Sequence, residues 1–225
     1  MKLKRIALLA IMMVAVLSAN AQYEPGKWGM HIKFGYGASL LSDLDKMPLV
    51  AGSADDEAIG ARVVGMDFEY QASSLIGLSV GLTHVWQGGG WKDIDMGNNM
   101  KAREPHVSLE YVTMPFIANF YVYKGLALKT GLELSYLSEA KCSMKTKEVF
   151  EGRDKTIKTT LDVEDDCNKF DLSIPIGVSY EFKSHFVLDA RFNLGLLKVN
   201  DSNIFGDKDI KNSSLMFTFG YKFDL

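Results

Sequence analysis

The residues of this sequence that come nearest to a catalytic arrangement are His106, Ser108 and Glu110. A serine nucleophile needs a nearby base and an acid that orients that base. In an extended strand, side chains two residues apart point to the same face, so these three would form one row. No further residue supports the row, and we interpret it as the solvated end of a strand. A hydrolase acting through Ser108 remains the alternative.

The only two cysteines, Cys142 and Cys167, lie near the two ends of one long polar segment. In an oxidising exterior, an even pair placed in this way predicts a disulfide. Closing a loop of about 25 residues would stabilise the fold by about 3 kcal/mol in the chain-entropy model. Two free thiols are the alternative.

The acidic run 162–166 offers carboxylate oxygens that could bind Ca²⁺. It lacks the glycine and the ligand spacing of an EF-hand, so we interpret it as a hydrated loop. We therefore expect no metal site and no cofactor in this chain.

A larger group of charged residues alternates with apolar residues along the chain. If the charged faces of these segments pointed into a narrow interior, acids and bases would have to neutralise each other, because buried charges persist only when paired. We therefore expect an interior ion-pair network, with a proton or ion pathway as the alternative. The residues are His31, Lys33, Asp67, Glu69, Lys129, Glu133, Lys169, Asp171, Glu181, Asp189, Arg191 and Lys222.

Eight segments carry this alternation, which is the period of a β-strand with one apolar face. They cover residues 28–40, 63–70, 76–86, 106–122, 126–136, 169–182, 186–196 and 214–225. Short connections at 72–74, 123–124 and 183–184 alternate with long ones at 41–59, 87–105, 138–168 and 199–211. Short turns on one rim and long loops on the other are typical of outer-membrane barrels. The pattern predicts an all-β fold, a closed antiparallel up-and-down transmembrane barrel of eight strands.

Alternation alone does not say which face points inward, and a soluble ligand-binding barrel would bury the apolar face. The polar faces are rich in glycine, which suits the narrow interior of an eight-stranded barrel. Aromatic residues also gather at the strand ends on the apolar face, as in an interfacial girdle. Both features favour apolar side chains that face lipid. The glycines are Gly35, Gly37, Gly65, Gly77, Gly81, Gly131, Gly177, Gly195 and Gly220.

The first 21 residues have the features of a cleaved export signal: a basic head, an apolar stretch at 6–17 and small residues before Ala21. Removing this segment leaves 22 basic residues (25 less Lys2, Lys4 and Arg5) against 28 acidic ones, a net charge of −6. Such a balance argues against nucleic acid as a partner. We assign 1–21 to the signal peptide and 22–225 to one barrel domain.

The chain resembles the PorT-like outer-membrane β-barrel family of Gram-negative bacteria. The resemblance rests on the signal ending Ala-Asn-Ala-Gln, on Tyr111-Val-Thr-Met-Pro-Phe-Ile, on the Pro-containing segment 170–182, and on Gly-Tyr-Lys-Phe at 220–223. It implies the barrel fold, whereas a role in protein secretion does not carry over, because members share architecture more securely than activity. Pro115 and Pro175 fall mid-strand, where we expect local bulges or bends.

These observations predict a small, non-enzymatic outer-membrane protein whose long loops contact a surface ligand or another envelope protein. Its other partners would be outer-membrane lipid and the assembly machinery of that membrane. A narrow transporter is one alternative. Another is a lipid-modifying hydrolase, since outer-membrane lipid A deacylases carry a His-x-Ser arrangement similar to His106 and Ser108.

Overall fold

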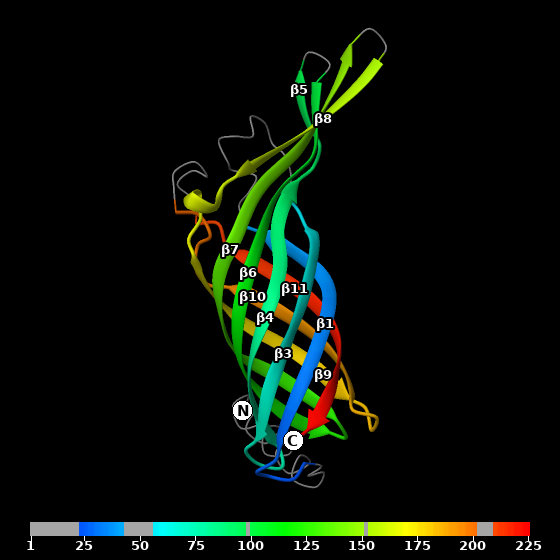
Figure 1. Ribbon diagram of the computed structural model, residues 1–225, viewed down its shortest axis with the longest axis vertical. Helices are drawn as coiled ribbons and strands as arrows, with labels where there is room; N and C mark the ends of the chain where they lie inside the picture. Colours follow the sequence, from blue (N-terminus) through cyan, green and yellow to red (C-terminus); the bar gives the residue numbers. More distant parts are fainter. Residues whose placement is uncertain (1–22, 43–55, 98–99, 151–152, 202–208) are drawn as a thin grey trace, which may run out of the picture.

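The computed structural model describes residues 23–42, 56–97, 100–150, 153–201 and 209–225. In this part of the chain, eight strands form one closed antiparallel ring (Figure 1). The ring closes because β1 pairs with β3 on one side and with β11 on the other. The predicted eight-stranded barrel is thereby confirmed. In ring order the strands are β1 (Trp28–Leu41), β3 (Ile59–Gln71), β4 (Ile76–Trp91), β6 (Met100–Tyr123), β7 (Leu126–Phe150), β9 (Phe170–Glu181), β10 (Phe186–Gly195) and β11 (Asn212–Asp224).

Two neighbouring strands continue far beyond the rest of the ring. β6 has 24 residues and β7 has 25, whereas the other ring strands have 10 to 16. β5 (Ile94–Gly97) pairs with the start of β6, and β8 (Arg153–Asp162) pairs with the end of β7. These paired parts of β5, β6, β7 and β8 project from one end of the barrel, and we call them the β5–β8 extension (Figure 1). A short β2 (Asp56–Glu57) pairs with β4, and the 3₁₀ helix η2 (Glu164–Asp166) follows β8.

The extension corrects two of the predicted loops, 87–105 and 138–168, which are largely strand. The reason is that a sheet with water on both sides has no apolar face, so its strands lack the alternation on which the prediction relied. Residues 156–162 of β8 are all exposed, so this part of the strand has no buried face. Register shifts next to His106 and Tyr111 in the β6–β7 pairing further interrupt the period. Most of the predicted loops 41–59 and 199–211, and all of the signal segment, lie outside the described residues.

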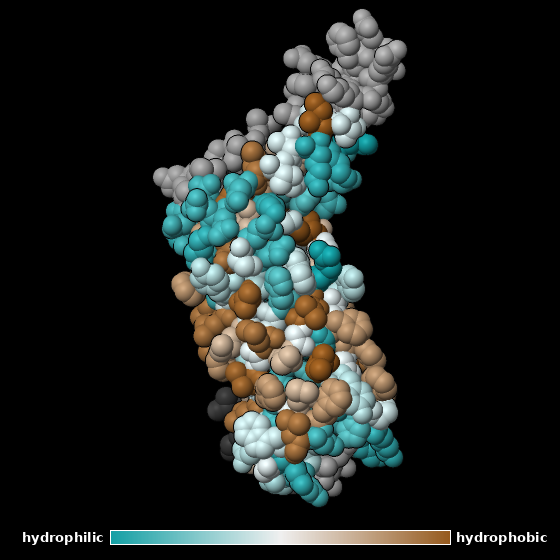
Figure 2. All heavy atoms as spheres, in the orientation of Figure 1, coloured by the Kyte–Doolittle hydropathy of each residue, from teal (hydrophilic) through white to brown (hydrophobic). Residues whose placement is uncertain are grey.

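The apolar faces of the ring strands point outward. Phe34 is 56% exposed and its neighbour Lys33 only 2%, and the same contrast repeats around the ring. Brown apolar residues accordingly gather over the barrel wall, while teal polar residues dominate above and below this band (Figure 2). Aromatic rings border the band at both ends: Trp28 contacts Tyr70 at the short-turn end, and Tyr136 contacts Phe170 at the other. This is the surface that a bilayer requires of a barrel.

The two mid-strand prolines interrupt backbone pairing without shifting its register. Pairing between β4 and β6 runs from Ile76↔Phe120 to Val80↔Phe116 and resumes at Thr83↔Thr113 with the same offset. Pairing between β7 and β9 likewise stops at Thr130↔Ile176 and resumes at Glu133↔Ser173. Each gap contains the proline, which has no N–H to donate. The expected bulges are therefore absent at Pro115 and Pro175 in these pairings, and each proline leaves a gap in the ladder instead.

The described residues contain no helix that is long and apolar enough to span a membrane.

Replacing the outward-facing Leu132, which lies halfway along the apolar part of β7 and is 48% exposed, with Arg should destabilise the barrel by about 2–4 kcal/mol. The reason is that the charge would face hydrocarbon. The free energy of unfolding from lipid vesicles, followed by tryptophan fluorescence, measures the effect. Leu161→Arg is the matched control, because Leu161 is also exposed, 54%, but lies on β8 in the extension. Equal effects of the two substitutions would contradict the proposed position of the bilayer.

Candidate functional site in the barrel interior

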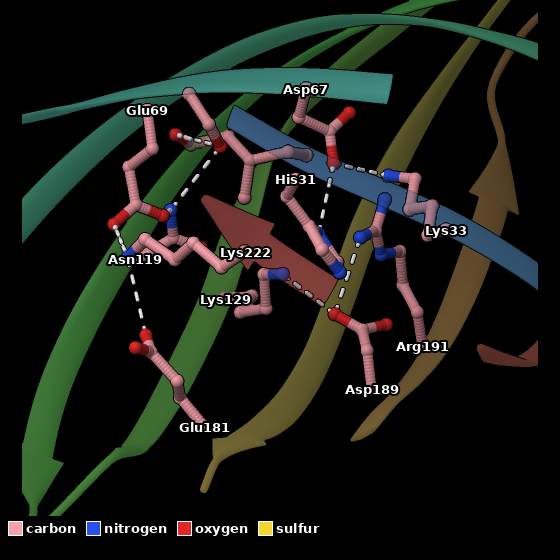
Figure 3. A network of polar contacts seen from close by, with 12 residues as sticks. His31, Lys33, Asp67, Glu69, Asn119, Lys129, Glu181, Asp189, Arg191 and Lys222 are labelled. Carbon is pink, nitrogen blue, oxygen red and sulfur yellow. Dashed lines mark hydrogen bonds and ion pairs between the residues drawn. The ribbon is translucent and has the colours of Figure 1, made fainter. Parts of the chain in front are cut away.

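Ionic side chains from several strands point toward one another in the interior of the barrel, as Figure 3 shows. Nearest the short-turn end, the ammonium group of Lys222 donates to Glu69 at 2.9 Å and to Glu181 at 3.2 Å. The amide of Asn119 donates to Glu69 at 2.7 Å, and the hydroxyl of Tyr23 donates to Glu181 at 2.9 Å. Burial and the Glu181 carboxylate raise the pKa of Tyr23, so its phenol stays protonated and remains a donor.

The next layer toward the middle of the barrel is more deeply buried. The Nζ atom of Lys33 lies 2.6 Å from an Asp67 oxygen, and that of Lys129 lies 2.7 Å from Asp189. Arg191 bridges two acids, with contacts of 2.9 Å to Glu133 and 3.3 Å to Asp189. His31 lies 3.7 Å from Asp67. All these side chains are at most 9% exposed, so each charge depends on its partners and not on water.

Glycines on neighbouring strands make room for these groups. A Cβ atom at Gly81 would lie 2.1 Å from Oδ1 of Asp67, and one at Gly220 would lie 2.3 Å from Nε2 of His31. Both distances are impossible contacts, so the glycine-rich polar faces are a condition for placing charged side chains in so narrow a space.

Above the ionic layers the interior becomes polar but mostly uncharged, and then apolar. Thr113 and Ser135 share a hydrogen bond of 2.8 Å on the inner wall. Beyond them, a buried apolar cluster fills the extended end, and we call it the apolar plug. It consists of Leu41, Trp91, Val107, Leu109, Tyr111, Leu137, Ala140, Cys167, Val199 and Ile210. This cluster contains no charged side chain, so it provides no ionic groups for the ion pathway that is the alternative to a filled interior.

The short-turn end opens instead into a pocket of about 510 Å³. Its lining includes Glu69, Glu181 and Lys222 from the ionic layer, together with Tyr23 and His185 nearer the rim. The pocket therefore gives water access to the lowest layer of the network but not to the deeper Lys33, Asp67 and Asp189.

Eleven of the twelve charged residues predicted for the interior line it. Lys169 is the exception: it lies at the rim and pairs with Glu164 of η2, with side chains 36% and 35% exposed. The acidic run around Glu164 thus contributes an ion pair. Within the described ranges, no three or more His, Cys, Asp or Glu residues are grouped so that they could hold a metal ion. Sequence reasoning missed Tyr23, Asn119 and Tyr121 as network members. Asn119 and Tyr121 share the odd-numbered inner face of β6 with Pro115, which could have revealed them.

His106, Ser108 and Glu110 lie in one row on β6, outside the barrel wall. Their neighbours Val107 and Leu109 point inward into the apolar plug. The His106 ring pairs with the backbone oxygen of Glu104 at 2.7 Å, and Glu110 lies 3.4 Å from Nε2 of His84. Among the described residues no hydrogen bond joins Ser108 to either of its supposed partners. The structure therefore does not assemble a nucleophile and base here.

Cys142 and Cys167 are free thiols in the structure, and the predicted disulfide is not formed there. β8 lies between them along the chain and places Leu161 opposite Cys142 in the β7–β8 pairing. Both cysteines nevertheless contact the same cluster, since Cys167 belongs to the apolar plug and Cys142 packs against it. Burial raises the pKa of the Cys167 thiol to about 12 and also raises that of Cys142. The bridge remains a prediction.

A closed ring with apolar residues outside and ion pairs inside defines a transmembrane β-barrel of the outer-membrane type. The profile of the outer membrane protein beta-barrel domain family matches residues 20–201, most of the chain, and this protein belongs to that family. Its place is accordingly the outer membrane.

Several solved barrels are similar to this chain at low identity. Ail, the attachment invasion locus protein of Yersinia pestis, is 14% identical with a TM-score of 0.43, over 89% of this chain and 100% of Ail. Neisserial surface protein A is 15% identical with a TM-score of 0.44, over 86% and 97% of the two chains. OprG from Pseudomonas aeruginosa is 12% identical with a TM-score of 0.41, over 91% and 99%. No curated protein sequence matches this chain. At this level of similarity the solved barrels support no functional argument.

Replacing Arg191 with Met should destabilise the barrel by about 3–5 kcal/mol, because Glu133 and Asp189 would keep buried charges without their shared cation. Equilibrium unfolding measures the loss. Lys145→Met is the control, since Lys145 pairs with Glu104 where both side chains are largely in water, and such a pair contributes about 0–1 kcal/mol. A small effect at Arg191 would mean that water or another cation reaches the central layer.

The predicted bridge between Cys142 and Cys167 can be tested by mass spectrometry after alkylation in denaturant. An oxidised pair takes up no label without reductant and two labels after reduction. Two labels without reductant would contradict the disulfide. In that case the raised thiol pKa values predict slow labelling of the folded protein at pH 8.

Proposed function

We propose that this protein is a non-enzymatic outer-membrane barrel that recognises a surface ligand or another envelope protein through the β5–β8 extension. The extension itself is the observation that carries the proposal. The outer face of β6 becomes polar at Glu110, and the strand begins at Met100. About ten residues at roughly 3.3 Å each carry the sheet some 33 Å along the strand beyond that level.

The chemistry of the extension supports a role in recognition. Among the described residues, β8 pairs only with β7, so its other edge presents backbone donors and acceptors to solvent. Ile157 is 45% exposed and Leu161 is 54% exposed on the same strand. An unpaired edge with apolar side chains is a surface that another extended segment can join. Neither the lumen, which is filled by side chains, nor the row of His106, Ser108 and Glu110 offers a comparable surface for binding a partner.

The finer assignment to PorT-like barrels is part of the same proposal. Its support is that the two motifs carrying the resemblance, 111–117 and 170–182, contain Pro115 and Pro175, and that both prolines interrupt a ladder in equivalent ways. Export through the predicted signal peptide and insertion by the assembly machinery of the outer membrane complete the proposal.

A photo-crosslinking residue at Thr160, on the exposed edge strand, should give a discrete crosslinked product in intact cells. The same probe at Ser184, in the exposed turn between β9 and β10, is the control at the opposite end of the barrel. A product specific to Thr160 identifies the partner by mass spectrometry. Identical product patterns from both sites, or only lipid adducts from Thr160, would contradict recognition by the extension.

A further inference from the structure

A small cavity of about 20 Å³ lies inside the barrel at the level of the uncharged polar residues. Asp171 of β9 faces Ser135 of β7 in the strand register, and Ser135 in turn faces Thr113 of β6. These three residues and Glu133 line the cavity from one side of the ring, while Asn212 lines it from β11. The volume is about that needed by one water-sized particle.

The balance of charge singles out Asp171. Six carboxylates and four cations occupy the interior, leaving His31 aside. Three of the cations form ion pairs with deeply buried acids: Lys33 with Asp67, Lys129 with Asp189, and Arg191 with Glu133. Asp171 is the other deeply buried acid in the described part of the chain.

Glu69 and Glu181 share Lys222 next to the open pocket. Asp171 is 7% exposed, and among the described residues it has no ion-pair partner. Its carboxylate accepts a hydrogen bond from the backbone N–H of Leu172 at 2.7 Å.

A second observation concerns the side-chain amides that line the same cavity. Asn212 is 4% exposed, and both polar atoms of its side-chain amide lack a hydrogen-bond partner among the described residues. Oδ1 of Asn193, which also lines the cavity, is unpaired as well. Buried amide groups in folded proteins are nearly always satisfied, and the oxygens of Asn212 and Asn193 are available to bind an occupant of the cavity.

We propose that the cavity binds one monovalent alkali cation of the Na⁺ class, held by Asp171 and neutral oxygens around it. Carboxylate, amide and hydroxyl oxygens are donors for hard cations. One unpaired carboxylate balances one positive charge, whereas a divalent ion would leave an excess. The apolar plug lies on one side of the cavity, and the ion-paired layer lies on the other. Together they separate the ion from the two ends of the barrel, so the site is structural and does not conduct ions.

The linkage of ion binding to folding tests this site. The urea unfolding equilibrium of the purified barrel is measured in lipid vesicles while NaCl replaces choline chloride at constant total chloride. Above the dissociation constant, each tenfold rise in Na⁺ should raise the folded-to-unfolded ratio about tenfold, since one ion binds only the folded state. Asp171→Asn keeps the shape but removes the charge, and its ratio should not change with Na⁺.

Two further variants sharpen the test. Asp201→Asn changes an exposed aspartate and should keep the response of the parent protein. The double variant D171N/N212D returns one carboxylate to the same cavity and should restore the response. A parent protein that unfolds identically in Na⁺ and choline, or a D171N variant that responds as strongly as the parent, would overturn the proposal.

Crystals soaked in a thallium(I) salt give an independent answer that does not depend on the stability of any variant. Tl⁺ substitutes for alkali cations and scatters anomalously. An anomalous peak beside Asp171 in the parent protein supports the site. Density there without anomalous signal identifies a water, which would mean that Asp171 is held as the neutral acid, and would overturn it.

Discussion

The closure of the sheet between β1 and β11 is the interaction on which the rest of the structure depends. Thirteen residue pairs, from Gly29↔Asp224 to Leu41↔Asn212, join the first and last strands of the ring. In hydrocarbon an unpaired backbone N–H or C=O costs several kcal/mol, so an open edge along these strands would outweigh the whole stability of an ordinary domain. Once the ring is closed with eight strands, its lumen is narrow and must be filled by its own side chains.

The filling of the lumen follows from that narrowness. The deeper polar-face residues cannot reach bulk water, so charges such as Lys33 and Asp67 are stable only against each other. Glycine at 81 and 220 leaves the space in which Asp67 and His31 lie, although glycine weakens a strand by roughly 0.5–1 kcal/mol. That cost is smaller than the penalty for a buried charge displaced from its partner, and the glycines are therefore the favourable choice.

Much of this architecture is predictable, because the alternation of residues along a strand is enough to assign its inner and outer faces. The sequence predicts that Lys33, Asp67 and Asp189 lie inside the barrel, because they alternate with apolar neighbours such as Phe34 and Leu188, and all three are buried. Alternation does not say how far a strand continues once both of its faces meet water, and for this reason the sequence does not predict the outer ends of β6 and β7 as strands. Nor does alternation predict which side chains that are distant in the sequence come into contact. The pairing of Cys142 with Leu161 depends on β8, whose Lys- and Thr-rich sequence gave no strand signal.

The extension owes its order to the membrane part below it. An isolated hairpin in water is marginal, and the water-exposed β8 buries too little apolar surface to hold a sheet by itself. β6 and β7, however, enter the extension already paired from Tyr123↔Leu126 upward, and their register is fixed where one face meets lipid. The entropic cost of closing this hairpin is offset by the pairs in the membrane part, and each further pair needs to order only its own residues. Such a sheet holds its free edge at a defined distance from the lipid, which a flexible loop of equal length would not do.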